Sequence, residues 1–256
     1  MGGVSPTRGR AARVPTLTRV DGEGPRGWGA PLHAAVLEAT AVGPRTTLLD
    51  LGCGTGGFAR AASDRGARVT GIDLDPAAVA RATAEVPEGV FVVGDAQEPP
   101  SGQFDVVVAV QLLMHVADPV AVLAAAARAG TVVAATVWGR QDECDIRVFG
   151  EALAPWLGQR PASGPPITDP TRLRAVAGQA GLDVERVDRV VCPFDYADDE
   201  ELLGPLFDSE LGRAVGRRAG PVALREAVLE RLAPYRTAAG GYRLENVFRV
   251  LVARRT

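Results

Sequence analysis

The sequence contains no lysine, since all 28 of its basic residues are arginine. Chemistry that needs a lysine amine, such as a Schiff base or a lysine nucleophile, is therefore excluded. Cysteine is also scarce: Cys53, Cys144 and Cys192 stand far apart and form no C-x-x-C pair. Neither a disulfide framework nor a zinc cluster is predicted. No apolar run reaches the roughly 18 residues that a membrane span needs.

Charge of one sign is not in excess, because the formal net charge is only −3. This balance provides no basic stripe for a nucleic acid, so neither a nucleic-acid nor a membrane partner is expected. The first residues carry arginine without a following apolar core, which is unlike a signal peptide. We therefore expect a cytoplasmic protein, as a monomer or a homodimer. Arginine without lysine, together with abundant alanine and glycine, is a composition typical of GC-rich bacterial genomes.

The chain divides into two parts by composition. Residues 1–26 are rich in Gly, Pro, Arg and Thr without periodicity, which predicts a flexible N-terminal tail. Residues 27–256 show alternating strand and helix patterns and are expected to form a single domain with a parallel sheet. Strands are predicted over 47–51, 68–73, 90–93, 104–110, 131–137, 182–193 and 247–253, and helices over 31–41, 58–65, 76–85, 119–129, 145–157, 170–181, 200–218 and 222–232. The stretch 198–243 is predicted to be a helical lid inserted between the last two strands.

A glycine-rich turn follows the first predicted strand, in the segment from Thr47 to Ala59. Glycines allow positive φ and let a ligand approach the backbone closely, and N–H groups at a helix start suit a polar ligand. Gly52, Gly54 and Gly57 satisfy the dinucleotide pattern G-x-G-x-x-G. Asp50, Gly52, Gly54 and Gly56 satisfy a second pattern, (D/E)-x-G-x-G-x-G. Both interpretations remain open from the turn alone.

Acidic residues at the ends of neighbouring strands discriminate between these two interpretations of the glycine turn. Asp73 ends the second strand about 20 residues past the turn, where a carboxylate accepts the hydroxyls of a ribose in either class. Asp95 follows the third strand, a position that a nicotinamide-binding fold does not need. Asp50 precedes the first glycine, where it would repel a diphosphate.

These spaced motifs, together with Phe104-Asp105, resemble class I S-adenosylmethionine (SAM)-dependent methyltransferases. Within that class, the segments 70–75 and 112–116 look like the quinone-type, small-molecule branch. The resemblance covers about residues 30–193 and 245–254 and implies an α/β, Rossmann-like fold. Its seven-stranded, mostly parallel sheet would have the order 3-2-1-4-5-7-6, with strand seven antiparallel, helices on both faces and a helical lid.

The resemblance also implies a cofactor site and an activity. SAM would be bound by Asp50, Gly52, Cys53, Gly54, Gly56, Asp73, Leu74, Asp95, Ala96, Gln111 and Trp28, and S-adenosylhomocysteine (SAH) would be the product. Metal-dependent relatives carry acidic ligands after strands four and five, where this chain has Gln111 and Trp138, so no metal is expected. The N-P-P-Y tetrapeptide of amide and amine methylases is absent, which leaves a small-molecule acceptor. A secondary metabolite or a quinone-like molecule is expected.

Two histidines are candidates for a catalytic base, because histidine ordinarily titrates near neutrality. His115 follows the fourth strand, and His33 lies in the first helix. Each has a structural alternative, and a methylation that needs no base remains open. This topology places several candidates for substrate contacts over the strand ends, namely Trp138, the loop 139–145, the insertion 198–243, Tyr242, Arg243 and Asn246. A SAM-binding cyclase-like catalyst and a catalytically silent partner subunit remain alternatives.

Overall fold

The computed structural model describes residues 24–25, 27–157 and 166–256. The tail predicted over 1–26 lies outside the described residues, apart from Gly24 and Pro25. All seven predicted strands lie within the described ranges.

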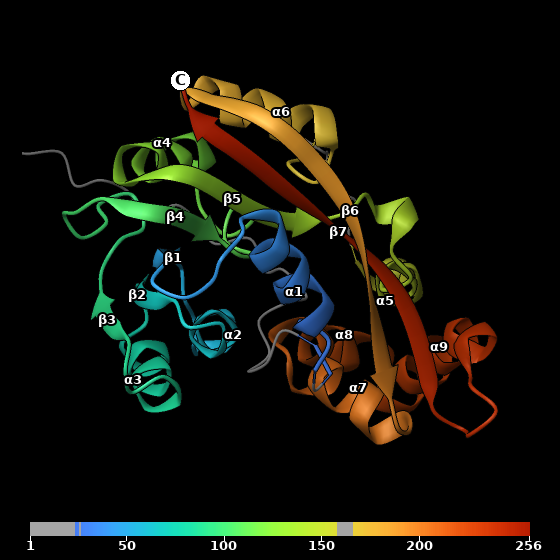
Figure 1. The fold of residues 1–256 in the computed structure, drawn as a ribbon. Coiled ribbons are helices and arrows are strands. Elements are labelled where there is room, and N and C mark those ends of the chain that lie inside the picture. Colours follow the sequence, from blue (N-terminus) through green and yellow to red (C-terminus); the bar gives the residue numbers. More distant parts are fainter. Residues whose placement is uncertain (1–23, 26, 158–165) are drawn as a thin grey trace, which may run out of the picture.

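The seven strands form one sheet with the order β3-β2-β1-β4-β5-β7-β6 (Figure 1). Strands β1 to β5 pair in parallel, and β7 pairs antiparallel with both β5 and β6. The predicted strand order is therefore confirmed. The strands are β1 (Thr47–Leu51), β2 (Arg68–Asp73), β3 (Val90–Val93), β4 (Phe104–Ala109), β5 (Gly130–Trp138), β6 (Leu182–Tyr196) and β7 (Tyr242–Arg255).

Helices cover both faces of the sheet. They are α1 (Ala30–Ala39), α2 (Gly57–Asp64), α3 (Pro76–Glu85), α4 (Pro119–Ala129), α5 (Arg147–Leu153), α6 (Pro170–Gln179), α7 (Asp199–Asp208), α8 (Glu210–Ala219) and α9 (Pro221–Leu232). One apolar cluster joins one face of the sheet to α1, α2, α5 and the helices α7 to α9. A second cluster joins the opposite face to α4 and α6. None of the helices in the described ranges combines the length and the apolar character needed to span a lipid bilayer.

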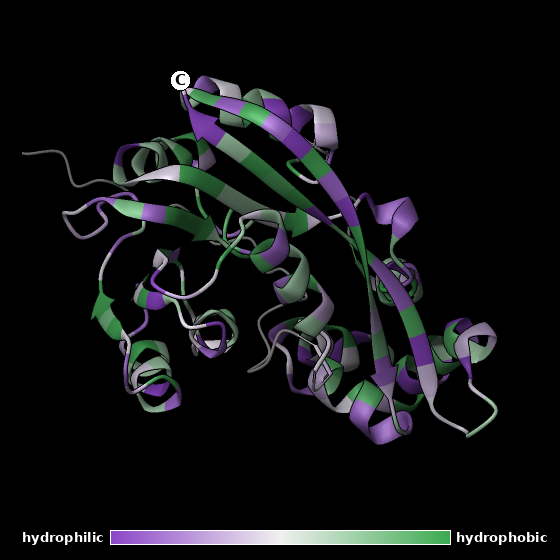
Figure 2. Cartoon of the chain, viewed as in Figure 1, coloured by the Kyte–Doolittle hydropathy of each residue, from purple (hydrophilic) through white to green (hydrophobic). Residues whose placement is uncertain are grey.

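The central strands are buried on both faces, which explains their nearly continuous apolar sequences. Four of the five residues of β1 and the last four of β4 are buried. In Figure 2 the inner strands β4 and β5 are mainly hydrophobic, whereas β6 at the sheet edge carries many hydrophilic residues. The carboxyl ends of β1, β2, β3, β4 and β5 consequently meet along one edge of a rigid sheet, where ligands of such sheets bind.

The last two strands are longer than predicted. We predicted a final strand over 247–253, but β7 begins at Tyr242 and pairs with β6 as far as Tyr196. Tyr242, Leu244 and Asn246 are buried and alternate with exposed residues, which is the period of a strand. Pro193 does not end β6, because β6 is an edge strand whose outer side needs no hydrogen bonds.

Several predicted helix boundaries were wrong. The helix expected over 145–157 is α5 followed by a 3₁₀ turn over Ala154–Trp156. The helix expected over 200–218 is divided into α7 and α8 by Ser209, whose extended backbone ends one helix while its hydroxyl accepts a hydrogen bond from Gly212 N and caps the next. The predicted start at Pro31 shifts by one residue, because Gly29 is the N-cap of α1.

Besides the apolar cluster, one carboxylate links the helices inserted between β6 and β7 to the sheet. Asp199 Oδ1 accepts hydrogen bonds from Tyr242 Oη at 2.6 Å and from Arg236 Nη2 at 2.7 Å, and Oδ2 accepts from Arg225 Nη2 at 2.8 Å. The Arg236 guanidinium also lies 4.8 Å from the centre of the Tyr242 ring. The insertion is thus anchored at the ends of the β6–β7 ribbon. A role for it as a lid remains a prediction.

Candidate functional site

The glycine turn after β1 has the conformation that the motif demands. Gly52, Gly54 and Gly56 have φ of +70°, +53° and +90°, in the left-handed region that favours glycine. Both Gly52 N and Cys53 N donate to the carbonyl oxygen of Ile72 in β2, at 2.8 and 3.0 Å. The turn is therefore a fixed feature of the sheet edge and leads directly into the first turn of α2.

The three glycines are needed for different reasons. A Cβ on Gly52 would lie 2.7 Å from Leu112 Cδ1, and a Cβ on Gly56 would lie 2.9 Å from the Cα of Ala82. A Cβ on Gly54 would meet nothing within 4 Å. A Cβ on Gly56 would thus press on a backbone atom and one on Gly52 on the end of a leucine side chain, whereas Gly54 borders open space. A ligand approaching the turn would contact the backbone at Gly54.

Asp73 lies at the end of β2, beside this open space. Its Oδ2 accepts a hydrogen bond from Gly54 N at 2.9 Å, and its Oδ1 accepts one from Asp75 N at 2.9 Å. A carboxylate has about four acceptor positions, so both oxygens can still accept hydroxyl donors. Asp73 therefore fixes the glycine turn and presents an acceptor pair of the kind that binds the hydroxyls of a ribose.

Asp50 and Cys53 are buried below the turn. Asp50 is only 1% exposed and occupies β1, where it pairs with Gly71 in register. Burial, followed by the negative charges of Asp50 and Asp73, raises the pKa of the Cys53 thiol well above its usual value. Cys53 is consequently a neutral thiol that fills space, and its contribution to a ligand would come from its backbone.

The residues after β2 and β3 form the next part of the same edge. Asp95 is exposed, and its Oδ1 accepts from Gln97 N at 2.9 Å in a local turn, while Ala96 is buried. Leu74 is 64% exposed, which is unusual for a leucine. An exposed apolar side chain and an exposed acceptor at the ends of neighbouring strands are features that a flat heterocycle with an amino group can use, and the adenine-binding role of Asp95 stays a prediction.

Gln111 has a strained backbone at the end of β4. Its φ is +54°, which is uncommon for any residue other than glycine. Both its backbone N and its Nε2 donate to Thr136 Oγ1 of β5, each at 2.9 Å, and Thr136 is fully buried. Strained residues concentrate at functional sites. Thr136 was not among the predicted site residues, although a hydroxyl within an otherwise apolar strand was a visible signal.

His33 belongs to α1, and its ring lies beside the start of α2. A Cβ on Gly57 would be 3.8 Å from its Cε1, and its ring meets Phe58 edge-on with centroids 5.5 Å apart. Burial lowers the pKa of His33 to about 4. The imidazole is therefore neutral at pH 7 and is a weaker base than an ordinary histidine. His115, the other candidate base, is exposed on the loop after β4, and its backbone N donates to Leu112 O.

The two tryptophans of the predicted site belong to one aromatic cluster. Trp28 is 9% exposed and packs on Phe194 and Phe248, with ring centroids 5.2 and 5.1 Å away. Trp138, at the end of β5, packs on the same two rings at 5.8 and 4.4 Å. Trp28 is thus a core residue in this arrangement, whereas Trp138 is only partly buried and also borders a cavity. The predicted contact of Trp28 with the cofactor remains untested.

The structure places the three predicted substrate residues of β7 in protein contacts. The ring of Tyr242 is buried and its hydroxyl is bound by Asp199. Arg243 pairs with Asp195 at 3.0 Å, and Asn246, which is fully buried, accepts a hydrogen bond from Ile146 N at 3.0 Å. These contacts stabilise the β6–β7 ribbon and the loop after β5, and the substrate role of the three residues stays a prediction.

Comparisons with known proteins agree with this geometry. A family model described as a methyltransferase domain matches residues 49–131, which contain the glycine turn and the ends of β2, β3 and β4. A 2-methyl-6-phytyl-1,4-hydroquinone methyltransferase of Synechocystis is 38% identical over 112 residues, which cover 40% of this chain and 35% of that protein. A ubiquinone biosynthesis O-methyltransferase of Pseudomonas paraeruginosa is 34% identical over 154 residues, covering 55% of this chain and 66% of that protein. The chain thus spans less than two thirds of either relative.

A solved structure shows the same fold over most of the chain. Magnesium protoporphyrin IX methyltransferase of Synechocystis, with bound SAH, matches with a TM-score of 0.54 at 16% identity, covering 89% of this chain and 84% of that one. The strand order, the glycine turn, the matching domain model and the curated relatives lead to one conclusion. The chain has the fold of the class I SAM-dependent methyltransferases, and its residues 49–131 match a methyltransferase domain.

Proposed function

We propose that the protein transfers the methyl group of SAM to a small-molecule acceptor without the help of a metal ion. The observation that carries this proposal is the open space at Gly54, bordered by the carboxylate of Asp73. Only a ligand that approaches the backbone closely and offers hydroxyl donors satisfies both features. SAM has such hydroxyls on its ribose.

The chain's own residues would hold the cofactor along one sheet edge. Asp73 would accept the ribose hydroxyls, while Leu74 and Asp95 would contact the adenine. The buried Asp50 and the strained Gln111 would stabilise the turn beside the amino-acid end. SAM supplies a methyl group on a sulfonium, and the protein supplies proximity and orientation.

A base is needed only when the accepting atom carries a proton, as a hydroxyl does. We propose His115 for this role, because it is exposed on the loop after β4, whereas the low pKa of His33 makes the latter a poor base at neutral pH. Metal independence is supported by the residue types at the ends of β4 and β5, where Gln111 and Trp138 offer no carboxylate.

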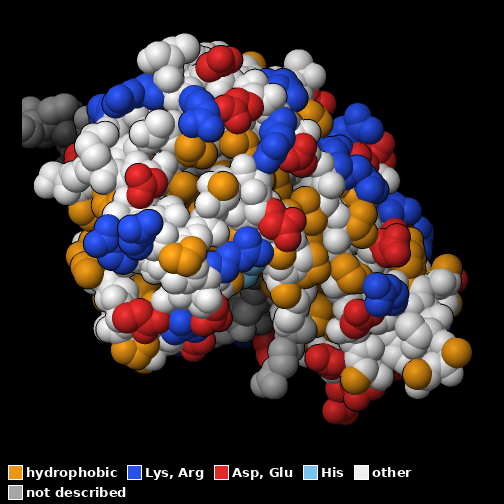
Figure 3. Space-filling view, in the orientation of Figure 1, with side chains coloured by type: hydrophobic (Ala, Val, Ile, Leu, Met, Phe, Trp, Pro, Cys, Tyr) orange, Lys and Arg blue, Asp and Glu red, His pale blue; other side chains and the backbone are white. Residues whose placement is uncertain are grey.

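The acceptor is proposed to be a quinone-like or secondary-metabolite ring. Two similar proteins are described as methyltransferases of a hydroquinone and of ubiquinone biosynthesis, which favours a quinone-like ring. Basic and acidic side chains are intermixed over the face of the molecule shown in Figure 3, with no broad area of positive charge there. This distribution supports a small molecule over a nucleic acid.

The proposal is tested by calorimetric titration with SAM and by mass-spectrometric detection of SAH during incubation with a panel of hydroxylated naphthoquinones and phenols. We expect micromolar SAM affinity, and SAH that accumulates only when a methylated product forms. A product that forms without SAH would instead indicate a non-methylating catalyst of the cyclase type. A loss of turnover in His115→Ala at unchanged SAM affinity is expected, and full turnover in that variant would remove His115 as the base.

A further inference from the structure

A cavity of about 430 Å³ lies beside the end of β5 and is not explained by the cofactor site. Its lining includes Trp138, Arg140, Gln141, Cys144, Ile146 and Asp169. Its volume is within the range of small-molecule sites. It opens on the same sheet edge as the glycine turn, because β5 is the second strand from β1 in the sheet order and parallel to it.

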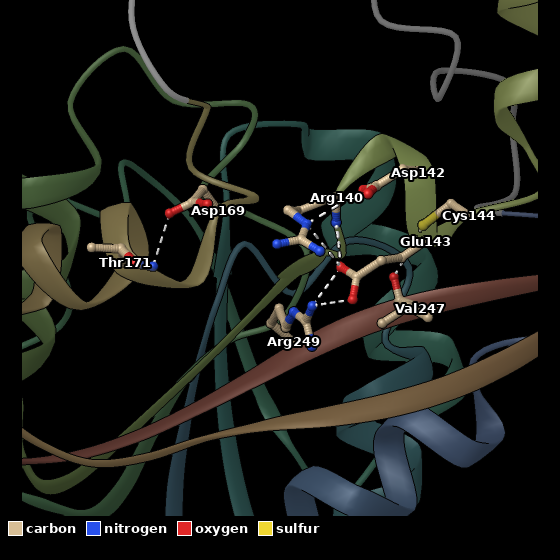
Figure 4. Close-up of polar contacts among 8 residues, drawn as sticks. All are labelled: Arg140, Asp142, Glu143, Cys144, Asp169, Thr171, Val247 and Arg249. Carbon is tan, nitrogen blue, oxygen red and sulfur yellow. Dashed lines mark hydrogen bonds and ion pairs between the residues drawn. The ribbon is translucent and has the colours of Figure 1, made fainter.

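Arg140 is the polar side chain best placed to recognise a ligand there. Its Nε donates to Asp142 Oδ1 at 3.3 Å and lies 3.8 Å from Glu143 Oε2. Within the described ranges neither of its terminal nitrogens donates a hydrogen bond to the protein. Figure 4 shows Arg140 between Asp169 and the pair formed by Glu143 and Arg249. The Nε side of the guanidinium is thus bound by Asp142 and Glu143, and the two terminal nitrogens remain for a ligand.

The held side is anchored to the sheet through Glu143. Arg249 of β7 donates through Nη2 to both carboxylate oxygens of Glu143, and the side chains are only 10% and 17% exposed. The Arg140 backbone N donates to Glu143 Oε2 at 2.9 Å. Although burial opposes ionisation, these hydrogen bonds and the charge of Arg249 keep the pKa of Glu143 below its usual value. The loop that carries Arg140 is therefore fixed by a buried ion pair.

The opposite wall offers an acceptor. Asp169 Oδ1 caps α6 by accepting from Thr171 N and Arg172 N, at 2.9 and 3.1 Å. In the described part of the chain, Asp169 forms no ion pair with Arg140 or any other arginine. Ile146, Cys144 and Trp138 provide apolar surface between these polar groups. The cavity thus combines a cationic donor, a carboxylate acceptor and an apolar floor.

We propose that this cavity is the acceptor subsite, and that Arg140 selects flat ring molecules bearing an ionised hydroxyl. This inference rests on the proposed function, because it names the substrate class of the same site. A guanidinium binds an anionic oxygen with charge-assisted hydrogen bonds, so Arg140 determines specificity without taking part in methyl transfer.

The experiment uses the full chain saturated with SAH, so that no methyl transfer occurs. The probes are hydroxynaphthoquinone, whose enol oxygen is ionised at neutral pH, and its methyl ether, which has the same ring without the charge. Binding is followed by quenching of tryptophan fluorescence. Arg140→Met keeps the apolar stem and removes the donors, and Arg174→Met on the exposed side of α6 is the matched control.

We expect the natural protein to bind the acid more tightly than the ether. Arg140→Met should weaken acid binding by roughly ten- to a hundred-fold, the range of hydrogen bonds to charged groups, and should leave ether and SAH binding unchanged. Arg174→Met should change nothing. Gln141→Trp, at an exposed position in the cavity wall, should block both probes.

Three results would overturn the inference: no binding of the acid by the natural protein, equal affinity for the acid and the ether, or undiminished acid affinity in Arg140→Met. Failure of the proposed function is distinguishable from these, because it would appear as absent SAM and SAH binding in the natural protein, measured separately by calorimetry.

Discussion

Replacing single glycines of the turn should separate folding from cofactor binding. In Gly54→Ala the new Cβ meets no protein atom within 4 Å, so the variant bears only the cost of a left-handed alanine at φ +53°. That cost is about 1 to 2 kcal/mol. The smaller entropy of the unfolded alanine chain offsets about 0.4 to 1 kcal/mol of it. We therefore expect Gly54→Ala to lower the free energy of unfolding by about 1 kcal/mol or less.

Gly56→Ala has an additional steric cost. Its Cβ would lie 2.9 Å from the Cα of Ala82, a backbone atom that cannot rotate away, and φ is +90°. Overpacking of this kind costs about 1 to 3 kcal/mol beyond the conformational term. Gly56→Ala should thus destabilise the protein by about 2 to 4 kcal/mol, because α2 or α3 must shift.

SAM affinity should fall more in Gly54→Ala than in Gly56→Ala, although Gly56→Ala is the less stable variant. The Cβ of Gly54→Ala projects into the space assigned to SAM, so affinity should fall at least tenfold while the fold is nearly unaffected. The assays are urea unfolding followed by circular dichroism, and calorimetric titration with SAM. Equal destabilisation by the two variants, or full SAM affinity in Gly54→Ala, would refute the assignment of the open space to the cofactor.

Three further predictions follow from named contacts. Asp73→Ala should weaken SAM binding by a few kcal/mol, because charge-assisted hydrogen bonds are lost, and calorimetry that finds unchanged affinity would reject the ribose role. Tyr242→Phe should lower the free energy of unfolding by about 1 to 2 kcal/mol in urea, because Asp199 loses a 2.6 Å hydrogen bond; an equally stable variant would contradict the anchoring of the insertion. The pKa of His33 is lowered from 6.5 to about 4, so the unfolded chain takes up the proton first. The neutral His33 ring therefore contributes fully to the free energy of unfolding above pH 6.5. This contribution is lost as the pH falls toward 4, and the loss is roughly 2 kcal/mol at pH 5. His33→Gln should remove this part of the decline in urea titrations at pH 7 and 5, and an identical decline in the variant would show that the ring is not desolvated.

The sheet was predictable from the sequence because its signals are local. Apolar runs end at Asp50 and Asp73, and the pairs Asp75-Pro76 and Asp118-Pro119 mark helix starts. In the structure both Asp75 and Asp118 are N-caps that accept backbone hydrogen bonds, as their residue type favours. The strand order then followed from resemblance to a family, and the structure confirms it.

The hydrogen-bond partners of polar side chains outside the sheet core could not be predicted in the same way. Tyr242 meets a residue 43 positions earlier, and Asn246 meets one 100 positions earlier. No local pattern encodes such pairs, because they depend on how the β6–β7 ribbon brings distant loops together. Arg140 was not singled out within the loop 139–145 for the same reason: the position of this loop depends on Arg249, which lies more than 100 positions away.

Gln111 and Thr136 connect the two halves of the site. Leu112, the neighbour of Gln111, packs where a Cβ on Gly52 would lie, and Thr136 stands two residues before Trp138 at the cavity. A left-handed glutamine costs about 1 to 2 kcal/mol, and two buried hydrogen bonds of about 1 kcal/mol each offset that cost. The strained backbone is therefore retained without a net loss of stability. Since one hydroxyl fixes both β4 and β5 at their ends, the glycine turn and the cavity beside Arg140 are held in a fixed relation, which is the condition that an in-line transfer between two bound molecules requires.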